Sequence, residues 1–116
     1  MTQFDWKKPT VQMLGRWQPW HPGHQALFER ALAKTGQVCI MIRDCEGWNN
    51  SNPFGLEEVC ARIRTALAAY EGQFEILVVP NITNITYGRL VGYQIEQEHF
   101  DEEIESISAT KIREAL

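Results

Sequence analysis

The spacing of apolar residues constrains the fold of this chain more than any other feature, because it alternates between the pattern of a buried strand and that of a helix. Mostly apolar runs at 11–14, 38–42 and 74–79 predict three buried strands. Residues 24–35 and 56–70 instead carry apolar side chains three and four positions apart, which is typical of amphipathic helices. This alternation, with short connections, predicts a parallel sheet with right-handed crossovers.

We therefore expect an α/β protein with a three-layer Rossmann-like fold, a mainly parallel sheet of about 4–5 strands, and helices on both faces. A further strand is expected at 93–97, and a last helix is expected to begin at Ser108, which suits the N-cap position. With 116 residues the chain has room for one domain, so residues 1–116 are predicted to form it.

Charge and composition argue against several classes of protein. The formal net charge of −4 argues against a nucleic-acid binder, whose surface would be basic. No signal peptide is visible, and no apolar run approaches the ~18 residues that a membrane span needs. Cys39, Cys45 and Cys60 match no paired zinc spacing, and we interpret them as reduced thiols of a cytoplasmic protein.

The segments that follow the predicted strands are candidates for a ligand site. Parallel α/β sheets bind ligands beyond the carboxyl ends of their strands. The connections after the three strands begin near Gly15, Arg43 and Asn81, and they contain most of the turn-forming residues of the chain. Because these connections meet at one edge of the sheet, the pattern alone predicts a site there.

The first of these connections, GRWQPWHPGH from Gly15 to His24, joins a strand to a helix. A glycine between a strand and a helix is typical of a phosphate site, because backbone N–H groups approach the anion at the positive end of the helix. His21 and His24 stand three positions apart, so both rings can reach one bound group. A metal pair is the alternative, but no further ligand cluster is evident, and we predict no metal-binding residues.

Three motifs carry a resemblance to known proteins. GRWQPWHPGH resembles the GxFxPxHxGH signature of the nucleotidyltransferases built on an HxGH motif, and ISATKIRE at 107–114 is similar to the ISxTxxR signature of the same superfamily. NPF at 52–54 is similar to a segment of archaeal-type nicotinamide-mononucleotide adenylyltransferases, which also carry GRFQPFH. The dinucleotide-binding pattern GxGxxG and the P-loop pattern are absent, so the sequence supports neither a dinucleotide-binding fold nor a P-loop kinase.

The resemblance implies an adenylyl- or cytidylyltransferase that moves AMP or CMP from a nucleoside triphosphate to a small phosphorylated acceptor and releases pyrophosphate. The attack on the α-phosphorus is in line, without a covalent intermediate, so the protein must position the phosphates and neutralise their charge. Mg²⁺ is expected as a bridge between phosphate oxygens, held by substrate and water. The substrate would be ATP or CTP; Gln18 stands where cytidylyltransferases usually carry Asp, which favours adenine slightly.

The same resemblance assigns roles to residues at both ends of the chain. His21 and His24 would donate hydrogen bonds to the α-phosphate and the leaving group, and Arg113 would clamp the phosphates as a third catalytic residue. The nucleotide-binding residues implied are Gly15, Arg16, Trp17, Gly23, Ser108, Ala109 and Thr110.

Other residues are weaker candidates. Arg43 and Arg89 each follow a strand at the ligand edge and are candidate contacts to phosphate or substrate. Trp17 and Trp20 fit either the core or a wall of the nucleotide pocket. The loop at 80–84 lacks the aspartate and the tryptophan-containing stretch of the nicotinamide-specific enzymes, which argues against nicotinamide mononucleotide as the acceptor. The polyol-phosphate cytidylyltransferases match this chain better in size.

Two other functions stay open. A non-catalytic nucleotide-binding or regulatory module would keep the phosphate site and lack acceptor recognition. A piece of a larger HxGH enzyme is the third candidate, such as a class I aminoacyl-tRNA synthetase, against which the net charge argues, or a sulfate adenylyltransferase. For the leading function we expect no nucleic-acid or membrane partner, and a homo-oligomer, because so small a sheet leaves edges and apolar faces to cover.

Overall fold

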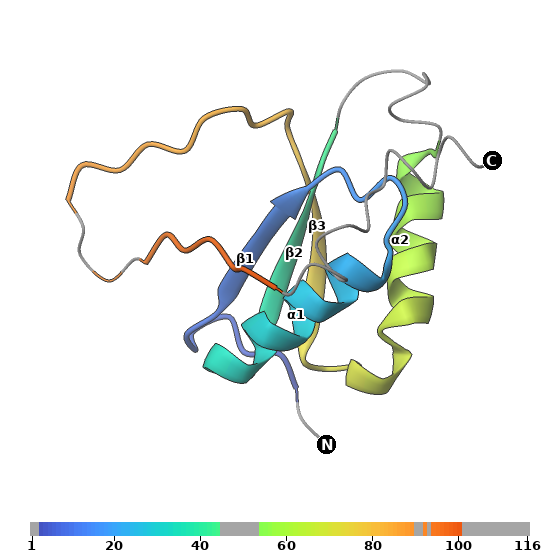
Figure 1. The fold of residues 1–116 in the computed structure, drawn as a ribbon, viewed down its shortest axis with the longest axis horizontal. Helices are drawn as coiled ribbons and strands as arrows, with labels where there is room; N and C mark the ends of the chain where they lie inside the picture. Colours follow the sequence, from blue (N-terminus) through green and yellow to red (C-terminus); the bar gives the residue numbers. More distant parts are fainter. Residues whose placement is uncertain (1–2, 45–53, 90–91, 93, 101–116) are drawn as a thin grey trace.

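The structure is a computed structural model, and it describes residues 3–44, 54–89, 92 and 94–100. In this part of the chain, strands and helices alternate, and a short 3-10 helix precedes the last strand (Figure 1). The predicted order of strand, helix, strand, helix and strand is confirmed. The elements are β1 (Val11–Gly15), α1 (Pro22–Thr35), β2 (Val38–Arg43), α2 (Leu56–Ala66), η1 (Ala68–Tyr70) and β3 (Phe74–Val79).

The strands form one parallel sheet in the order β1-β2-β3, and α1 and α2 are its crossovers. The carboxyl ends of the strands are level, since Gly15 of β1 pairs with Ile42 of β2, which pairs with Val78 of β3. This arrangement confirms an α/β fold that is compatible with a Rossmann-like architecture. The expected sheet of about 4–5 strands is not confirmed, because the described residues contribute three strands and 94–97 have no regular structure.

Both described helices cover the same face of the sheet (Figure 1). Val38, Ile40 and Ile42 of β2 are fully buried beneath them, in one cluster with residues of α1 and α2. Right-handed crossovers that advance in one direction across a sheet place successive helices on the same side. The prediction of helices on both faces is therefore not met within the described residues. Neither described helix has the length and apolar composition that crossing a membrane requires.

The opposite face of the sheet is less buried. Leu14, Met41 and Leu77 alternate along their strands with the core residues and lie beside one another in the parallel register. Each of them is only partly buried. The difference between the faces follows from the topology of the described elements, because both crossovers use the same side.

Local signals fix both ends of α1. His21 is the N-cap, in extended backbone, and Pro22 occupies the first helical position, where its missing N–H has no partner to lose. At the other end Gly36 has φ 85°, a left-handed conformation that glycine adopts without strain, and its N–H donates to the Leu32 carbonyl at 2.8 Å. The helix thus ends at a glycine in the left-handed conformation that is common just past helix ends.

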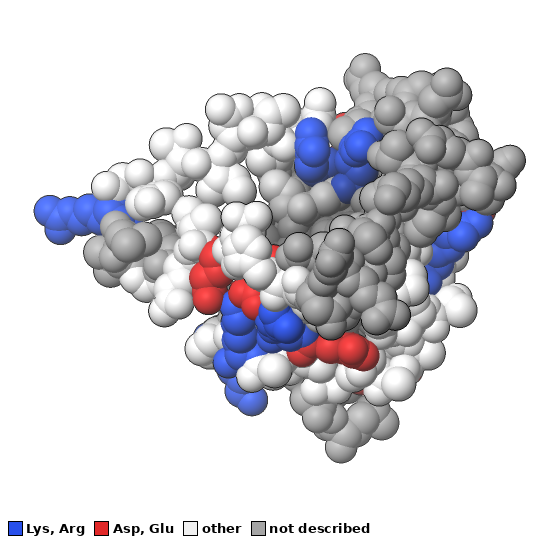
Figure 2. All heavy atoms as spheres, viewed as in Figure 1, with Lys and Arg blue, Asp and Glu red and all other residues white. Residues whose placement is uncertain are grey.

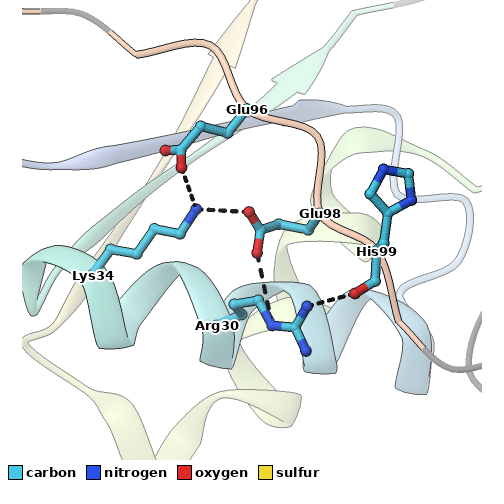
Figure 3. Close-up of polar contacts among 5 residues, drawn as sticks. All are labelled: Arg30, Lys34, Glu96, Glu98 and His99. Carbon is cyan, nitrogen blue, oxygen red and sulfur yellow. Dashed lines mark hydrogen bonds and ion pairs between the residues drawn. The ribbon is translucent and has the colours of Figure 1, made fainter.

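The chain that follows β3 leaves the body of the domain and returns across α1 (Figure 1). Residues 94–100, the return segment, are held on α1 by ion pairs (Figure 3). The ammonium of Lys34 lies 2.7 Å from a Glu98 carboxylate oxygen and 3.0 Å from one of Glu96, and Arg30 pairs with Glu98 at 3.7 Å. The hydrogen bond between Lys34 and Glu98 is the largest cause of a raised pKa at Lys34 and a lowered pKa at Glu98.

Candidate functional site

The strands end together at the edge of the sheet where the sequence predicts a ligand site. β1 ends at Gly15, β2 at Arg43 and β3 at Val79. Figure 2 shows Lys and Arg atoms in the upper part of the view, above these strand ends. A basic edge of this kind attracts anionic ligands.

The indole of Trp17 covers the end of β1. A Cβ placed on Gly15 would lie 3.0 Å from two atoms of this ring, so the indole requires a glycine beneath it. Trp17 itself has φ 54°, a left-handed conformation that is uncommon for a side chain of this size, and its ring N–H donates to the Met41 carbonyl at 3.1 Å. Glycine is therefore needed at this position for packing, in addition to the anion approach that the sequence suggests. Such backbone strain is often found at functional sites.

The two histidines of the motif lie against each other at the start of α1. The rings of His21 and His24 are stacked, with centroids 3.6 Å apart and planes inclined by 20°. The Trp17 ring meets the His24 ring edge-on, with 4.8 Å between their centroids, and the centroid of the Trp20 ring lies 5.4 Å from that of His24. His21 is buried. These contacts hold both imidazoles in one orientation.

Reciprocal hydrogen bonds define which nitrogen of each ring carries a proton. Nδ1 of His21 accepts from the backbone N–H groups of Gly23 at 3.0 Å and of His24 at 3.4 Å. Nδ1 of His24 accepts from the backbone N–H of His21 at 3.2 Å. Because a neutral imidazole that accepts at Nδ1 carries its proton at Nε2, we assign the Nε2–H tautomer to both rings.

Both histidines are held neutral at neutral pH. Burial lowers the pKa of His24 to about 3, and the charge of His21 is the smaller cause. Burial also lowers the pKa of His21, against a backbone hydrogen bond that raises it. Protonation of either Nδ1 would in addition break a helix-capping bond. The pair therefore offers two N–H donors without a net charge.

This arrangement changes how the helix start can meet an anion. Pro22 has no N–H, and the amides of Gly23 and His24 are directed to the His21 ring. The donors that remain at this helix start are the Nε2–H groups of the histidines, and no described residue is seen to accept from them. The start of α1 would thus meet an anion through the imidazole rings, because the N–H groups of its first turn already have acceptors.

Gln18 is a residue of the site that the sequence argument does not assign. Its side chain is 6% exposed, and its amide forms two hydrogen bonds with the backbone of Phe54, both 2.9 Å long. Phe54 lies 36 positions away in the sequence, just before α2. The spacing of apolar residues cannot predict a contact between residues this far apart. The only hint in the sequence is that a polar side chain stands between a buried strand and a helix start.

The structure places the remaining predicted residues as follows. Arg16 directly follows β1, and Gly23 lies in the first turn of α1. Arg43 ends β2 and donates to the Asn81 side-chain oxygen at 2.9 Å. Arg89 is exposed on the loop that projects from the body, and its contact with substrate stays a prediction. Four of the predicted site residues lie outside the described part of the chain, namely Ser108, Ala109, Thr110 and Arg113.

Comparison with known proteins gives a partial match. No protein-family model matches the chain. A nicotinamide-nucleotide adenylyltransferase of Methanococcus vannielii is 28% identical over 71 residues, which are 60% of this chain and 41% of that protein. The chain thus spans less than half the length of this relative. Together with the parallel α/β sheet, the match supports a nucleotidyltransferase-like relationship.

Proposed function

We propose that this chain is a nucleotidyltransferase that moves AMP or CMP from ATP or CTP to a small phosphorylated acceptor and releases pyrophosphate. The observation that carries the proposal is the stacked, neutral pair of His21 and His24, which offers two Nε2–H donors at the carboxyl edge of the sheet. The partial similarity to an adenylyltransferase supports the same class of reaction.

In the proposed step, an oxygen of the acceptor phosphate attacks the α-phosphorus of the triphosphate in line. A P–O bond forms while the bond from the α-phosphorus to its bridging oxygen breaks, and pyrophosphate leaves with that electron pair. Negative charge then needs stabilisation on the equatorial and leaving oxygens. His21 and His24 suit this task because they donate hydrogen bonds from fixed positions and need not transfer a proton.

Arginines would supply the fixed positive charge. Arg16 follows β1 and Arg43 ends the neighbouring β2, and paired strands lie about 4.8 Å apart. The bond from Arg43 to Asn81 orients its guanidinium between the ends of β2 and β3. In the proposal, Ser108 and Thr110 would cradle the β- and γ-phosphates, and Mg²⁺ that binds with the substrate would help to neutralise their charge.

The described residues do not form a protein cage for magnesium. Among them, no group of three or more His, Cys, Asp or Glu side chains could hold a metal ion. The Nδ1 atoms of His21 and His24 are engaged by backbone N–H groups. The proposed ion would therefore be held by phosphate oxygens and water, and the roles assigned to the histidines do not depend on it.

Pyrophosphate release tests the proposal. Purified protein is incubated with magnesium and either ATP or CTP, together with a panel of phosphorylated acceptors that includes nicotinamide mononucleotide and polyol phosphates. We expect release with one triphosphate and one class of acceptor, at a rate that depends on both. Triphosphate binding without release for any pair would favour the non-catalytic nucleotide-binding module instead.

A further inference from the structure

Gln18 joins the connection that carries the two histidines to the segment just before α2. The N–H of Phe54 donates to the Oε1 atom of Gln18, and the Nε2 atom of Gln18 donates to the Phe54 carbonyl. The first segment is the connection that carries His21, and the second is the start of α2. The two hydrogen bonds therefore set how far the start of α2 lies from the histidines.

The start of α2 has no side-chain cap. Its N-cap, Gly55, makes no side-chain hydrogen bond to the first turn. Phe54 is instead fixed by Gln18 on its backbone and by its ring, which packs against the core beneath the Arg62 guanidinium at 4.4 Å. The helix is thus anchored by the residue before it.

The residue type at this position matters. A primary amide donates and accepts at the same time, whereas a carboxylate only accepts and an apolar side chain does neither. Both bonds to Phe54 are therefore available to Gln18 and would be lost in part with glutamate and entirely with methionine. Removing one partner of a buried polar pair leaves the other unsatisfied.

We infer that Gln18 is a positioning residue of the proposed nucleotidyl transfer, which holds the start of α2 as a second wall of the site opposite His21 and His24. The inference rests on the proposed function. Gln18 acts through Phe54 and touches no reacting atom in this role. A small displacement of a positioning group can reduce productive binding of substrate by a large factor.

Gln37 provides a matched control at the other end of the sheet. Gln37 is 5% exposed, and its amide also accepts from and donates to the backbone of one residue, with bonds from the Asp5 N–H at 3.0 Å and to the Asp5 carbonyl at 2.7 Å. It donates in addition to the Lys8 carbonyl at 3.4 Å and to the Thr10 hydroxyl at 2.7 Å. It directly precedes β2, at the amino end of the sheet. Substitution of Gln37 thus removes a buried amide that is bonded to the backbone, at the end of the sheet away from the candidate site.

The experiment compares Gln18→Met and Gln18→Glu with Gln37→Met and Gln37→Glu. Kinetics of pyrophosphate release, thermal unfolding and hydrogen exchange are measured for each. We expect Gln18→Met to speed exchange at the Phe54 amide about tenfold and to raise the KM of one substrate at least about fivefold, with kcat within about twofold. Gln37→Met should speed exchange at Asp5 and leave KM and kcat unchanged. Equal kinetics for the two sets of variants would overturn the inference.

A second measurement separates failure of this inference from failure of the proposed function. If the unsubstituted protein releases no pyrophosphate, the proposed reaction is wrong, and binding of ATP and CTP is then measured by calorimetry. Weaker binding to Gln18→Met than to Gln37→Met would support the positioning role at a nucleotide site. Equal binding, or no binding by the unsubstituted protein, would overturn it.

Discussion

Two buried glutamines lie at opposite ends of the sheet, and the residues around them differ in backbone strain. At the amino end, the amide of Gln37 binds Asp5 and Thr10, in a segment where the described backbone shows no left-handed conformation outside glycine. At the carboxyl end, Gln18 follows Trp17 in its left-handed conformation and precedes the stacked histidines. Both ends use the same amide chemistry to join distant segments.

The difference shows that a buried, fully bonded amide does not by itself mark a functional site. Gln37 fastens the N-terminal segment to the sheet, which is a structural role. At the carboxyl end the amide coincides with backbone strain and with histidine pKa values lowered by burial. Strain and shifted pKa values concentrate at functional sites, so their combination distinguishes this end of the sheet.

The largest expected effect comes from the histidines. His21→Asn keeps a side chain that can cap the helix but lacks the imidazole donor, so we expect kcat to fall roughly 10²-fold or more while the fold is retained. Steady-state pyrophosphate release and circular dichroism measure the two properties. His99→Asn, on the exposed return segment, is the control and should leave kcat unchanged. Full activity of His21→Asn would show that the histidines at the carboxyl end of the sheet do not take part in the reaction.

The next effect tests the strained packing at the carboxyl end. Gly15→Ala places a Cβ 3.0 Å from the Trp17 ring, so the indole must move. We expect the free energy of unfolding to fall by about 1–3 kcal/mol, as for overpacking elsewhere, and urea denaturation measures it. Gly88→Ala is the matched control, because a Cβ there meets nothing within 4 Å. Equal stability of the two variants would show that the indole is not held against β1.

Stability should also depend on pH through His24. His24 binds a proton near its ordinary pKa of 6.5 in the unfolded chain and only near 3 in the folded chain. The contribution of His24 to the free energy of unfolding is therefore complete above pH 6.5 and is lost as the pH falls toward 3. Each pH unit in this window is worth about 1.4 kcal/mol, so we expect a loss of about 2 kcal/mol by pH 5. Urea denaturation between pH 7 and pH 5 measures it. A slope in His24→Asn as steep as in the unsubstituted protein would contradict the assignment.

The smallest effect is expected at the return segment. Lys34→Met removes both close ion pairs to 94–100, and exposed ion pairs contribute little to stability and weaken in salt. We expect faster hydrogen exchange in 94–100, a similar increase for the unsubstituted protein in high salt, and no resolved change in Tm. Lys7→Met is the control for loss of an exposed lysine. A large fall in Tm would mean that the return segment belongs to the core.

The described part of the fold followed from periodicity. The three strands, both helices and the stop at Gly36 were predictable because each depends on residues that are neighbours in the sequence. Within the described residues both helices lie on one face, so the prediction of helices on both faces is not confirmed there. The motif also indicates that His21 and His24 lie together, as they do in the structure, and their role in a reaction stays a prediction.

The sequence by itself determined the order of the elements, the helix start at the histidines and the glycine at the end of the first strand, because local spacing fixes which side chains share a strand or a helix face. Only the tertiary structure decided that Trp17 lies over Gly15 and that Gln18 meets Phe54. The docking of 94–100 on α1 was likewise set by tertiary contacts, whereas the ring nitrogens that carry protons are set by local hydrogen bonds at the start of α1. The contacts of Gln18 with Phe54 and of α1 with 94–100 join residues that are far apart in the sequence. The paths of the loops between them depend on packing and on hydrogen-bond partners, which the periodicity of the sequence does not encode.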